Sequence, residues 1–112
     1  MKGNLSCPCG KCSGVLDTNL LSLLSFIEKA MEKELYITSG YRCQEHNLSV
    51  GGVPNSAHTK GLDVDISMSS DKDRYTLITL LLSGGMNRIG IAKTFIHADK
   101  DPTLNAKRIW VY

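Results

Sequence analysis

Apolar residues recur every three or four positions between Leu20 and Met31, and charged residues fill the positions between them. This spacing gathers the apolar side chains on one face of a helix, so it predicts an amphipathic helix that ends near Glu34. Residues 17–19 (Asp-Thr-Asn) precede the stripe, and such side chains accept hydrogen bonds from the free N–H groups at a helix start. The helix is therefore expected to begin close to Asp17.

Shorter apolar runs along the rest of the chain predict strands. A second helix is expected over residues 71–82, closed by two glycines. Alternation or β-branched content predicts strands over residues 35–38, 62–66, 88–91, 95–98 and 109–112. The order of these elements indicates an α+β fold with a mainly antiparallel sheet packed by two helices. A long polar loop over residues 41–60 separates the first two strands, and loops of that length are usually functional.

The length and composition restrict the class of protein. The chain has 112 residues, 42% of them hydrophobic and 21% charged, which is typical of a single globular domain with a Cys-rich segment at residues 1–16. A formal charge of +2, with scattered basic residues, argues against a nucleic-acid partner. No apolar run approaches the roughly 20 residues that cross a bilayer, so membrane insertion is not expected. Nothing in the sequence calls for more than a monomer.

The first residues, Met1–Cys7, include one Lys but no apolar stretch, so they do not resemble a secretory signal. Synthesis in the cytoplasm without a signal peptide is therefore expected.

The residues with the most informative chemistry are His58, Asp65 and His97. Asp65 follows His58 by seven positions, and Gly61 between them permits a tight turn into the predicted strand. His97 lies on another predicted strand, so the three side chains converge if these strands are neighbours. Two His and one carboxylate with an open fourth position form a common catalytic zinc site. The alternative is that the His residues have unrelated roles on the surface or in hydrogen bonds.

The segment Ser56-x-His58-x-x-Gly61-x-x-x-Asp65 resembles the signature S-x-H-x-x-G-x-A-x-D of the zinc D-Ala-D-Ala carboxypeptidase family. That family shares its fold with the hedgehog signalling domain and includes small phage-type peptidoglycan peptidases. Three further segments resemble family segments in the same order, namely residues 37–42 (Ile-Thr-Ser-Gly-Tyr-Arg), 95–99 (Phe-Ile-His-Ala-Asp) and 108–112 (Arg-Ile-Trp-Val-Tyr).

The resemblance implies roles for individual residues. His58, Asp65 and His97 would be the zinc ligands. Arg42 would contact substrate and stabilise charge at the scissile carbonyl, since a guanidinium stays cationic. The other implied roles are substrate binding by Ser56 and Tyr41 and orientation of His97 by Asp99.

Two positions depart from the family pattern. Asp63 replaces the usual small residue before the ligand Asp. Thr94 stands where many members carry the carboxylate that acts as general base, and a hydroxyl cannot replace it. Asp63, Asp99 or His46 would then have to move the proton.

The four cysteines leave three states open. Cys7, Cys9, Cys12 and Cys43 match the ligand number of a closed, structural zinc site, in which His46 could replace one thiolate. The alternatives are that the four cysteines form two disulfides or remain free thiols.

The resemblance implies a metal-dependent hydrolase that cuts peptidoglycan stem peptides, as a D-Ala-D-Ala carboxypeptidase or an endolysin-type endopeptidase. Phage-like enzymes of this kind reach the cell wall after release or delivery. The alternative class is a non-catalytic zinc module that binds the wall or has a structural role on the same fold.

Overall fold

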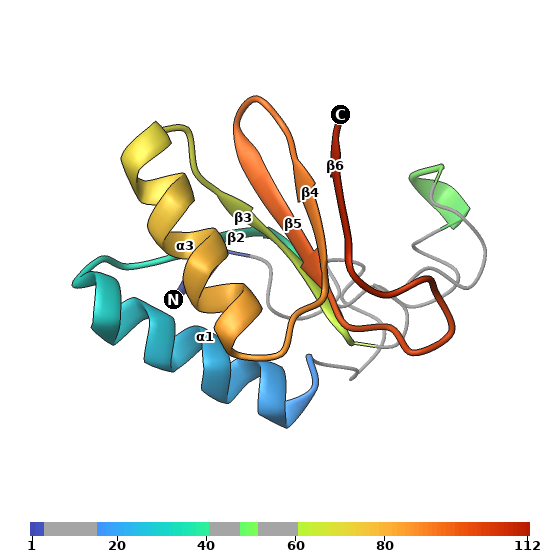
Figure 1. The fold of residues 1–112 in the computed structure, drawn as a ribbon, viewed down its shortest axis with the longest axis horizontal. Helices are drawn as coiled ribbons and strands as arrows, with labels where there is room; N and C mark the ends of the chain where they lie inside the picture. Colours follow the sequence, from blue (N-terminus) through green and yellow to red (C-terminus); the bar gives the residue numbers. More distant parts are fainter. Residues whose placement is uncertain (4–15, 41–47, 52–60) are drawn as a thin grey trace.

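A computed structural model describes residues 1–3, 16–40, 48–51 and 61–112 of the chain. Two helices pack on one face of a six-stranded sheet (Figure 1). The helices are α1 (Thr18–Met31) and α3 (Asp71–Ser83). The strands are β1 (Lys2–Gly3), β2 (Tyr36–Ser39), β3 (Asp63–Ser67), β4 (Arg88–Ile91), β5 (Phe95–Asp99) and β6 (Arg108–Val111).

Both helices begin at the residues that the sequence indicates. The Asp17 carboxylate accepts a hydrogen bond from the backbone N–H of Leu20 at 3.2 Å, and the Ser70 hydroxyl caps α3 in the same way. The first helix ends three residues earlier than expected, because Glu32 adopts a left-handed conformation with φ of 53° and closes the last turn. The expected helices are thus confirmed with small shifts at their ends.

The sheet has the order β1-β2-β3-β5-β4-β6. The three inner pairs, β2–β3, β3–β5 and β5–β4, are antiparallel. The two outer pairs, β1–β2 and β4–β6, are parallel. The expectation of a mainly antiparallel sheet is therefore wrong in this respect: the α+β fold has a mixed sheet.

The connections between strands explain the two parallel pairs. Helix α1 returns the chain from β1 to the same end of the sheet before β2, as a parallel pair requires. Residues 100–107 carry the chain from β5 past the start of β4, where β6 begins. No sequence signal predicted β1, which lies within the Cys-rich N-terminal segment.

The apolar core fills the space between the helices and the sheet. Its largest members come from both layers and are less than 2% exposed; among them are Leu20, Leu24 and Ile27 of α1, Leu77 and Leu81 of α3, and Val64, Ile66, Ile89 and Ile96 of the sheet. Since side chains alternate between the two faces of a strand, the residues next to these point to the other face of the sheet. That face carries the polar residues of β3 and β5.

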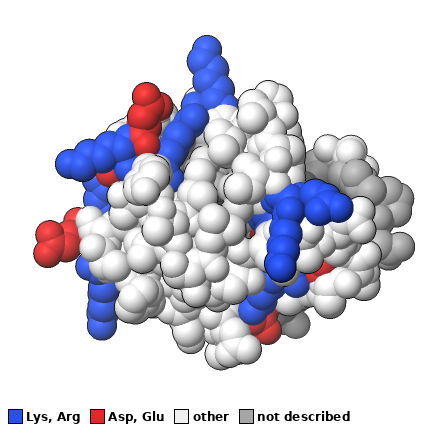
Figure 2. Space-filling model, viewed as in Figure 1, with Lys and Arg blue, Asp and Glu red and all other residues white. Residues whose placement is uncertain are grey.

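On the face shown in Figure 2, charged side chains do not form a single patch. Lysines and arginines lie in separate groups, with acidic residues beside them. Among the described residues, no helix combines the length and apolar character needed to cross a bilayer.

Candidate metal centre

Two neighbouring rows of residues cross the sheet on the face away from the helices. In the first row Asp65 pairs with His97, His97 with Gly90, and Gly90 with Trp110. In the second row Asp63 pairs with Asp99, and Asp99 with Arg88. Strand pairing thus brings residues separated by up to 47 positions onto one face of the sheet.

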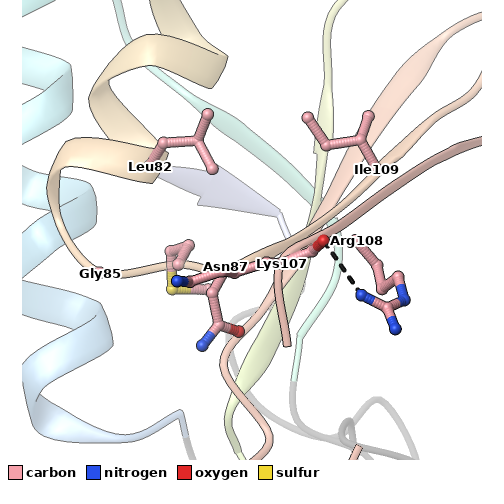
Figure 3. A pocket seen from close by; sticks show the side chains of 7 residues that line it. Leu82, Gly85, Asn87, Lys107, Arg108 and Ile109 are labelled. Carbon is pink, nitrogen blue, oxygen red and sulfur yellow. Dashed lines mark hydrogen bonds between the residues drawn. The ribbon is translucent and has the colours of Figure 1, made fainter. Parts of the chain in front are cut away.

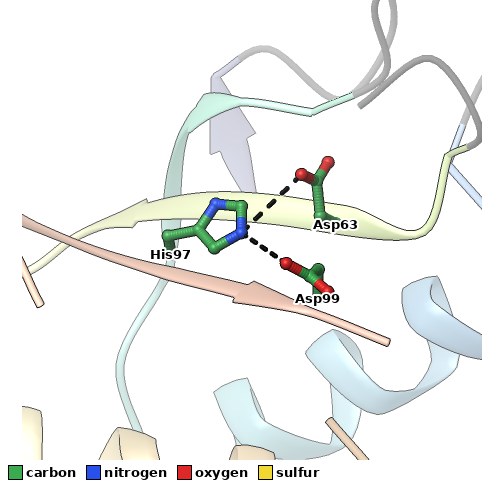
Figure 4. A group of neighbouring side chains, drawn as sticks. All are labelled: Asp63, His97 and Asp99. Atoms are coloured by element: carbon green, nitrogen blue, oxygen red, sulfur yellow. Dashed lines mark hydrogen bonds and ion pairs between the residues drawn. The ribbon is translucent and has the colours of Figure 1, made fainter. Parts of the chain in front are cut away.

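His97 is the centre of this cluster and contacts carboxylates through both ring nitrogens. Its Nδ1 lies 2.8 Å from Asp65 Oδ1, and its Nε2 lies 2.8 Å from Asp99 Oδ2. Asp63 Oδ2 lies 3.8 Å from the same Nε2, as Figure 4 shows. The two strands that carry Asp65 and His97 are neighbours in the sheet, as expected, and the two side chains are in contact.

The environment of His97 favours a protonated ring in the metal-free protein. Burial by itself lowers the pKa of His97, but the hydrogen bonds to Asp65 and Asp99 and the charges of Asp65 and Asp63 outweigh it and raise the pKa to about 9. A positive charge at this position compensates the carboxylates around it. Any cation that replaces the proton would do the same.

The cluster has the composition of a metal site. One ligand atom from each of Asp63, His97 and Asp99 lies within 4.8 Å of the others, and all three residues are buried. Carboxylate oxygen and imidazole nitrogen are ligands that Zn²⁺ accepts. Asp65 adds a further carboxylate on the opposite side of the ring.

Sequence reasoning missed Arg88, which contacts this cluster. Its Nε lies 3.1 Å from Asp99 Oδ1 and 3.3 Å from Asp99 Oδ2, and its guanidinium carbon lies 5.1 Å from the centre of the Trp110 ring. Part of the signal was present in the sequence, because residues 88–91 and 95–98 were expected as consecutive strands. End-to-end pairing of those ranges would place Arg88 opposite Ala98, and the observed register, shifted by one residue, places it opposite Asp99.

An aromatic group borders the cluster. The rings of Trp110 and His97 are 5.5 Å apart, and Tyr112 contacts both Trp110 and Phe95. Burial raises the pKa of the Tyr112 hydroxyl.

Four of the site residues predicted from the sequence therefore lie together: Asp63, Asp65, His97 and Asp99. The others lie outside the described residues, namely Tyr41, Arg42, His46, Ser56, His58, Cys7, Cys9, Cys12 and Cys43. Two described glycines lie next to these segments in the chain. Gly61 has φ of 70°, as expected for the tight turn into β3, and Gly40, which directly precedes residues 41–47, is buried.

Thr94 lies apart from the cluster. It is exposed in the turn between β4 and β5, and its carbonyl accepts a hydrogen bond from Met68 N–H. This position thus offers a hydroxyl and no carboxylate.

A cavity of about 370 Å³ lies elsewhere, between the end of α3 and the start of β6. Figure 3 shows its lining, which includes Leu82, Asn87 and Ile109. None of the four clustered site residues lines it.

Comparison with known proteins identifies a family. The family model described as Peptidase M15 matches residues 2–99, a range that includes Asp63, Asp65, Arg88, His97 and Asp99 but not the bordering Trp110 and Tyr112. No curated protein matches the chain.

Proposed function

Because the chain belongs to the Peptidase M15 family, we propose that it is a zinc-dependent peptidase that hydrolyses a peptide bond in peptidoglycan stem peptides. The observation that carries the proposal is the position of His97, between Asp65 at one ring nitrogen and the Asp63–Asp99 pair at the other. The stem-peptide substrate, cut by a carboxypeptidase or an endolysin-type endopeptidase, rests on the motif resemblance alone. A phage-like delivery to the wall has the same basis.

The clustered residues fit a zinc ion chemically. Three carboxylates surround one imidazole in a largely buried space, where an added cation compensates their charge. The two ring nitrogens offer the ion two sides, one with Asp65 and one with Asp63 and Asp99.

Solvent access favours the Asp65 side. A catalytic zinc needs an open position for water or substrate. The Asp65 side chain is 18% exposed, whereas those of Asp63 and Asp99 are 2% and 3% exposed. We therefore assign Nδ1 of His97 and the Asp65 carboxylate as zinc ligands, with His58 as the third ligand on the motif resemblance.

The remaining site residues would act on the substrate from the segment 41–60. Ser39 pairs with Asp65 in the sheet and precedes Arg42 by three positions. This short distance along the chain supports a role for Arg42 at the scissile carbonyl and for Tyr41 beside it. Ser56, two residues before His58, is proposed to bind substrate.

Zinc, when bound, polarises a carbonyl and lowers the pKa of its bound water to about 7. The protein itself orients the ligands. Asp99 accepts a hydrogen bond from Nε2–H of His97, and the ring then directs Nδ1 toward Asp65. Both oxygens of Asp99 are engaged, by His97, Arg88 and the backbone N–H of Asp101. These contacts favour an orienting role for Asp99, and Asp63 and His46 are proposed for the group that moves the proton.

Zinc stoichiometry of the tag-free protein, measured by elemental mass spectrometry, tests the metal site. We expect His97→Ala and His58→Ala each to lose one zinc relative to the wild type. A wild type with two zinc ions would support a second, structural site at the cysteines. A single zinc that survives both substitutions would assign it to the cysteines and refute the catalytic site.

Cleavage of purified cell wall and of synthetic stem peptides, with and without a chelator, tests the activity. The enzyme proposal predicts products that chelator suppresses and zinc restores. Thr94 favours a second candidate, a non-catalytic zinc module that binds the wall, because no carboxylate stands at that position. Intact wall and peptides across a pH series, with zinc bound, would favour that module over the peptidase.

A further inference from the structure

Arg88 joins four parts of the structure around the His97 cluster. Its backbone belongs to β4, its Nε contacts both oxygens of Asp99 on β5, and its Nη1 donates to the carbonyl of Asn105 in the segment before β6. Its guanidinium also lies 5.1 Å from the ring centre of Trp110 on β6. The Arg88 and Asp99 side chains are 17% and 3% exposed, so their contact is largely shielded from water, whereas the hydrogen bond to Asn105 is exposed.

The contacts of Arg88 use properties that only arginine combines. A guanidinium donates in fixed directions from separate nitrogens and stacks on an aromatic ring, whereas a lysine ammonium is a single charged point on a flexible stem. At this position one nitrogen restrains Asp99 while another is held by a backbone carbonyl. Asp99 therefore cannot rotate freely away from His97.

The orientation of Asp99 determines what His97 can offer to a ligand. An ionised carboxylate only accepts hydrogen bonds, so Asp99 Oδ2 at 2.8 Å requires a proton on Nε2 of His97. With that proton held on Nε2, the lone pair of a neutral His97 lies on Nδ1, which faces Asp65 at 2.8 Å. Asp65 lies at the same distance from Nδ1, but Arg88 holds Asp99 and the Asp65 side is the more exposed, so Nδ1 is the nitrogen open to a ligand.

We propose that Arg88 is a positioning residue for the metal centre, which restrains Asp99 so that His97 keeps its proton on Nε2 and presents Nδ1 beside Asp65. This inference rests on the proposed function in one respect, the assignment of the Nδ1 side to zinc. Arg88 touches neither metal nor substrate in this arrangement and acts only through Asp99.

The test compares Arg88→Lys and Arg88→Gln with Arg74→Lys as a matched control. Arg74 is also a partly buried arginine that donates to backbone carbonyls, of Met68 and Ala92, but it has no contact with the cluster. Zinc affinity is measured by competition with a chromophoric chelator, and folding is followed by thermal unfolding. We expect the two Arg88 variants to bind zinc about 10- to 100-fold more weakly, the range for loss of a group that orients a metal ligand. Arg74→Lys should keep wild-type affinity.

A spectroscopic measurement on His97 separates positioning from a general structural role. In ¹⁵N-labelled wild-type protein loaded with zinc, His97 should show a protonated Nε2, whose proton exchanges slowly with water. The Arg88 variants should lose that protection while their other amide signals persist. Wild-type zinc affinity together with an unchanged Nε2 signal in the variants would overturn the proposal. A wild type that lacks the protected Nε2 proton would overturn it even if both variants failed to fold.

These outcomes are distinct from those that bear on the proposed function. Zinc binding that depends on Arg88, in a protein that cuts no peptide, would support the positioning role and refute the peptidase. Cleavage that persists in both Arg88 variants with unchanged zinc affinity would support the peptidase and refute the positioning role of Arg88.

Discussion

The ring of Trp110 lies 5.5 Å from the ring of His97, although the strands that carry them are separated by β4. Gly90 is the residue between them in the sheet, paired with His97 on one side and Trp110 on the other. Because Gly90 has no side chain, Trp110 extends across β4 and borders the His97 cluster. The aromatic border therefore depends on a glycine.

Replacing Gly90 by alanine should displace that border. A Cβ at this position would lie 2.8 Å from ring atoms of Trp110 and Tyr112, closer than real Cβ contacts. We expect Gly90→Ala to lower the free energy of unfolding by about 1–3 kcal/mol, the usual cost of overpacking. Urea unfolding measures the loss, and the emission of Trp110, the chain's single tryptophan, reports its movement. Unchanged emission and stability would contradict the close approach of these side chains.

The two aspartates of β3 should differ in their importance for zinc. Asp65→Asn removes the charge of the proposed ligand, so we expect zinc affinity to fall by about 100-fold or more, beyond the ~10- to 100-fold effect typical of residues that only support a ligand. Asp63→Asn, the matched control, keeps the shape of a residue that is 1% exposed and should cost at most about 10-fold. Calorimetric titration with Zn²⁺ measures both. A larger loss in Asp63→Asn than in Asp65→Asn would assign the metal to the Nε2 side of His97.

Zinc binding should release a proton near neutral pH. In the metal-free protein the pKa of His97 is raised to about 9, so the ring carries a proton on each nitrogen at pH 7. A metal ligand must be deprotonated, and zinc therefore has to displace the proton on Nδ1. The affinity for zinc should accordingly rise with pH and level off above about pH 9, where His97 is deprotonated before zinc binds. Calorimetry in buffers of different ionisation enthalpy counts the protons. Binding at pH 7 with no proton release would contradict a ligand role for His97.

The cap of α1 should contribute stability that depends on pH. Removing it in Asp17→Ala should cost about 1 kcal/mol of unfolding free energy. The pKa of Asp17 is lowered, first by the N–H of Leu20 and then by the hydrogen bond from Lys100. A group with a lowered folded-state pKa stabilises the protein above its unfolded pKa of about 3.9, and this stability is lost as pH falls through the lower folded value.

The difference between wild type and Asp17→Ala in chemical denaturation should therefore shrink as pH falls below about 4. Asp17→Asn is the matched control, since an amide oxygen also caps a helix but carries no charge. Its advantage over Asp17→Ala should not vary with pH in that range. A pH-independent difference for the wild type would show that the Asp17 charge contributes nothing.

Much of the site could be predicted from local sequence. The spacing of Leu20, Leu24 and Ile27 determined the helix that covers the sheet, because an apolar stripe of that period has one stable arrangement. Alternation in residues 62–66 put Asp63 and Asp65 on one face of a strand for a similar reason. The family motif then indicated His97 as their partner.

Only the tertiary structure decided what surrounds His97. Alternation gives the face on which Asp63 and Asp65 lie but not their exposure, which depends on the neighbouring strands: Asp63 is 1% exposed, whereas Asp65 is only partly buried. Likewise, the strand at the C-terminal end of the chain was expected, but its parallel position beside β4 was not, because pairing across residues 92–107 leaves no local pattern.

That pairing is what brings Trp110 to His97 across Gly90 and over the Arg88 guanidinium. Periodicity along a chain records which side of an element is buried. Contacts between elements depend on strand order and register, and these are settled by how well the whole set of side chains packs. The sequence by itself thus predicted most of the elements and the candidate metal ligands, and the assembled sheet determined that both ring nitrogens of His97 face carboxylates.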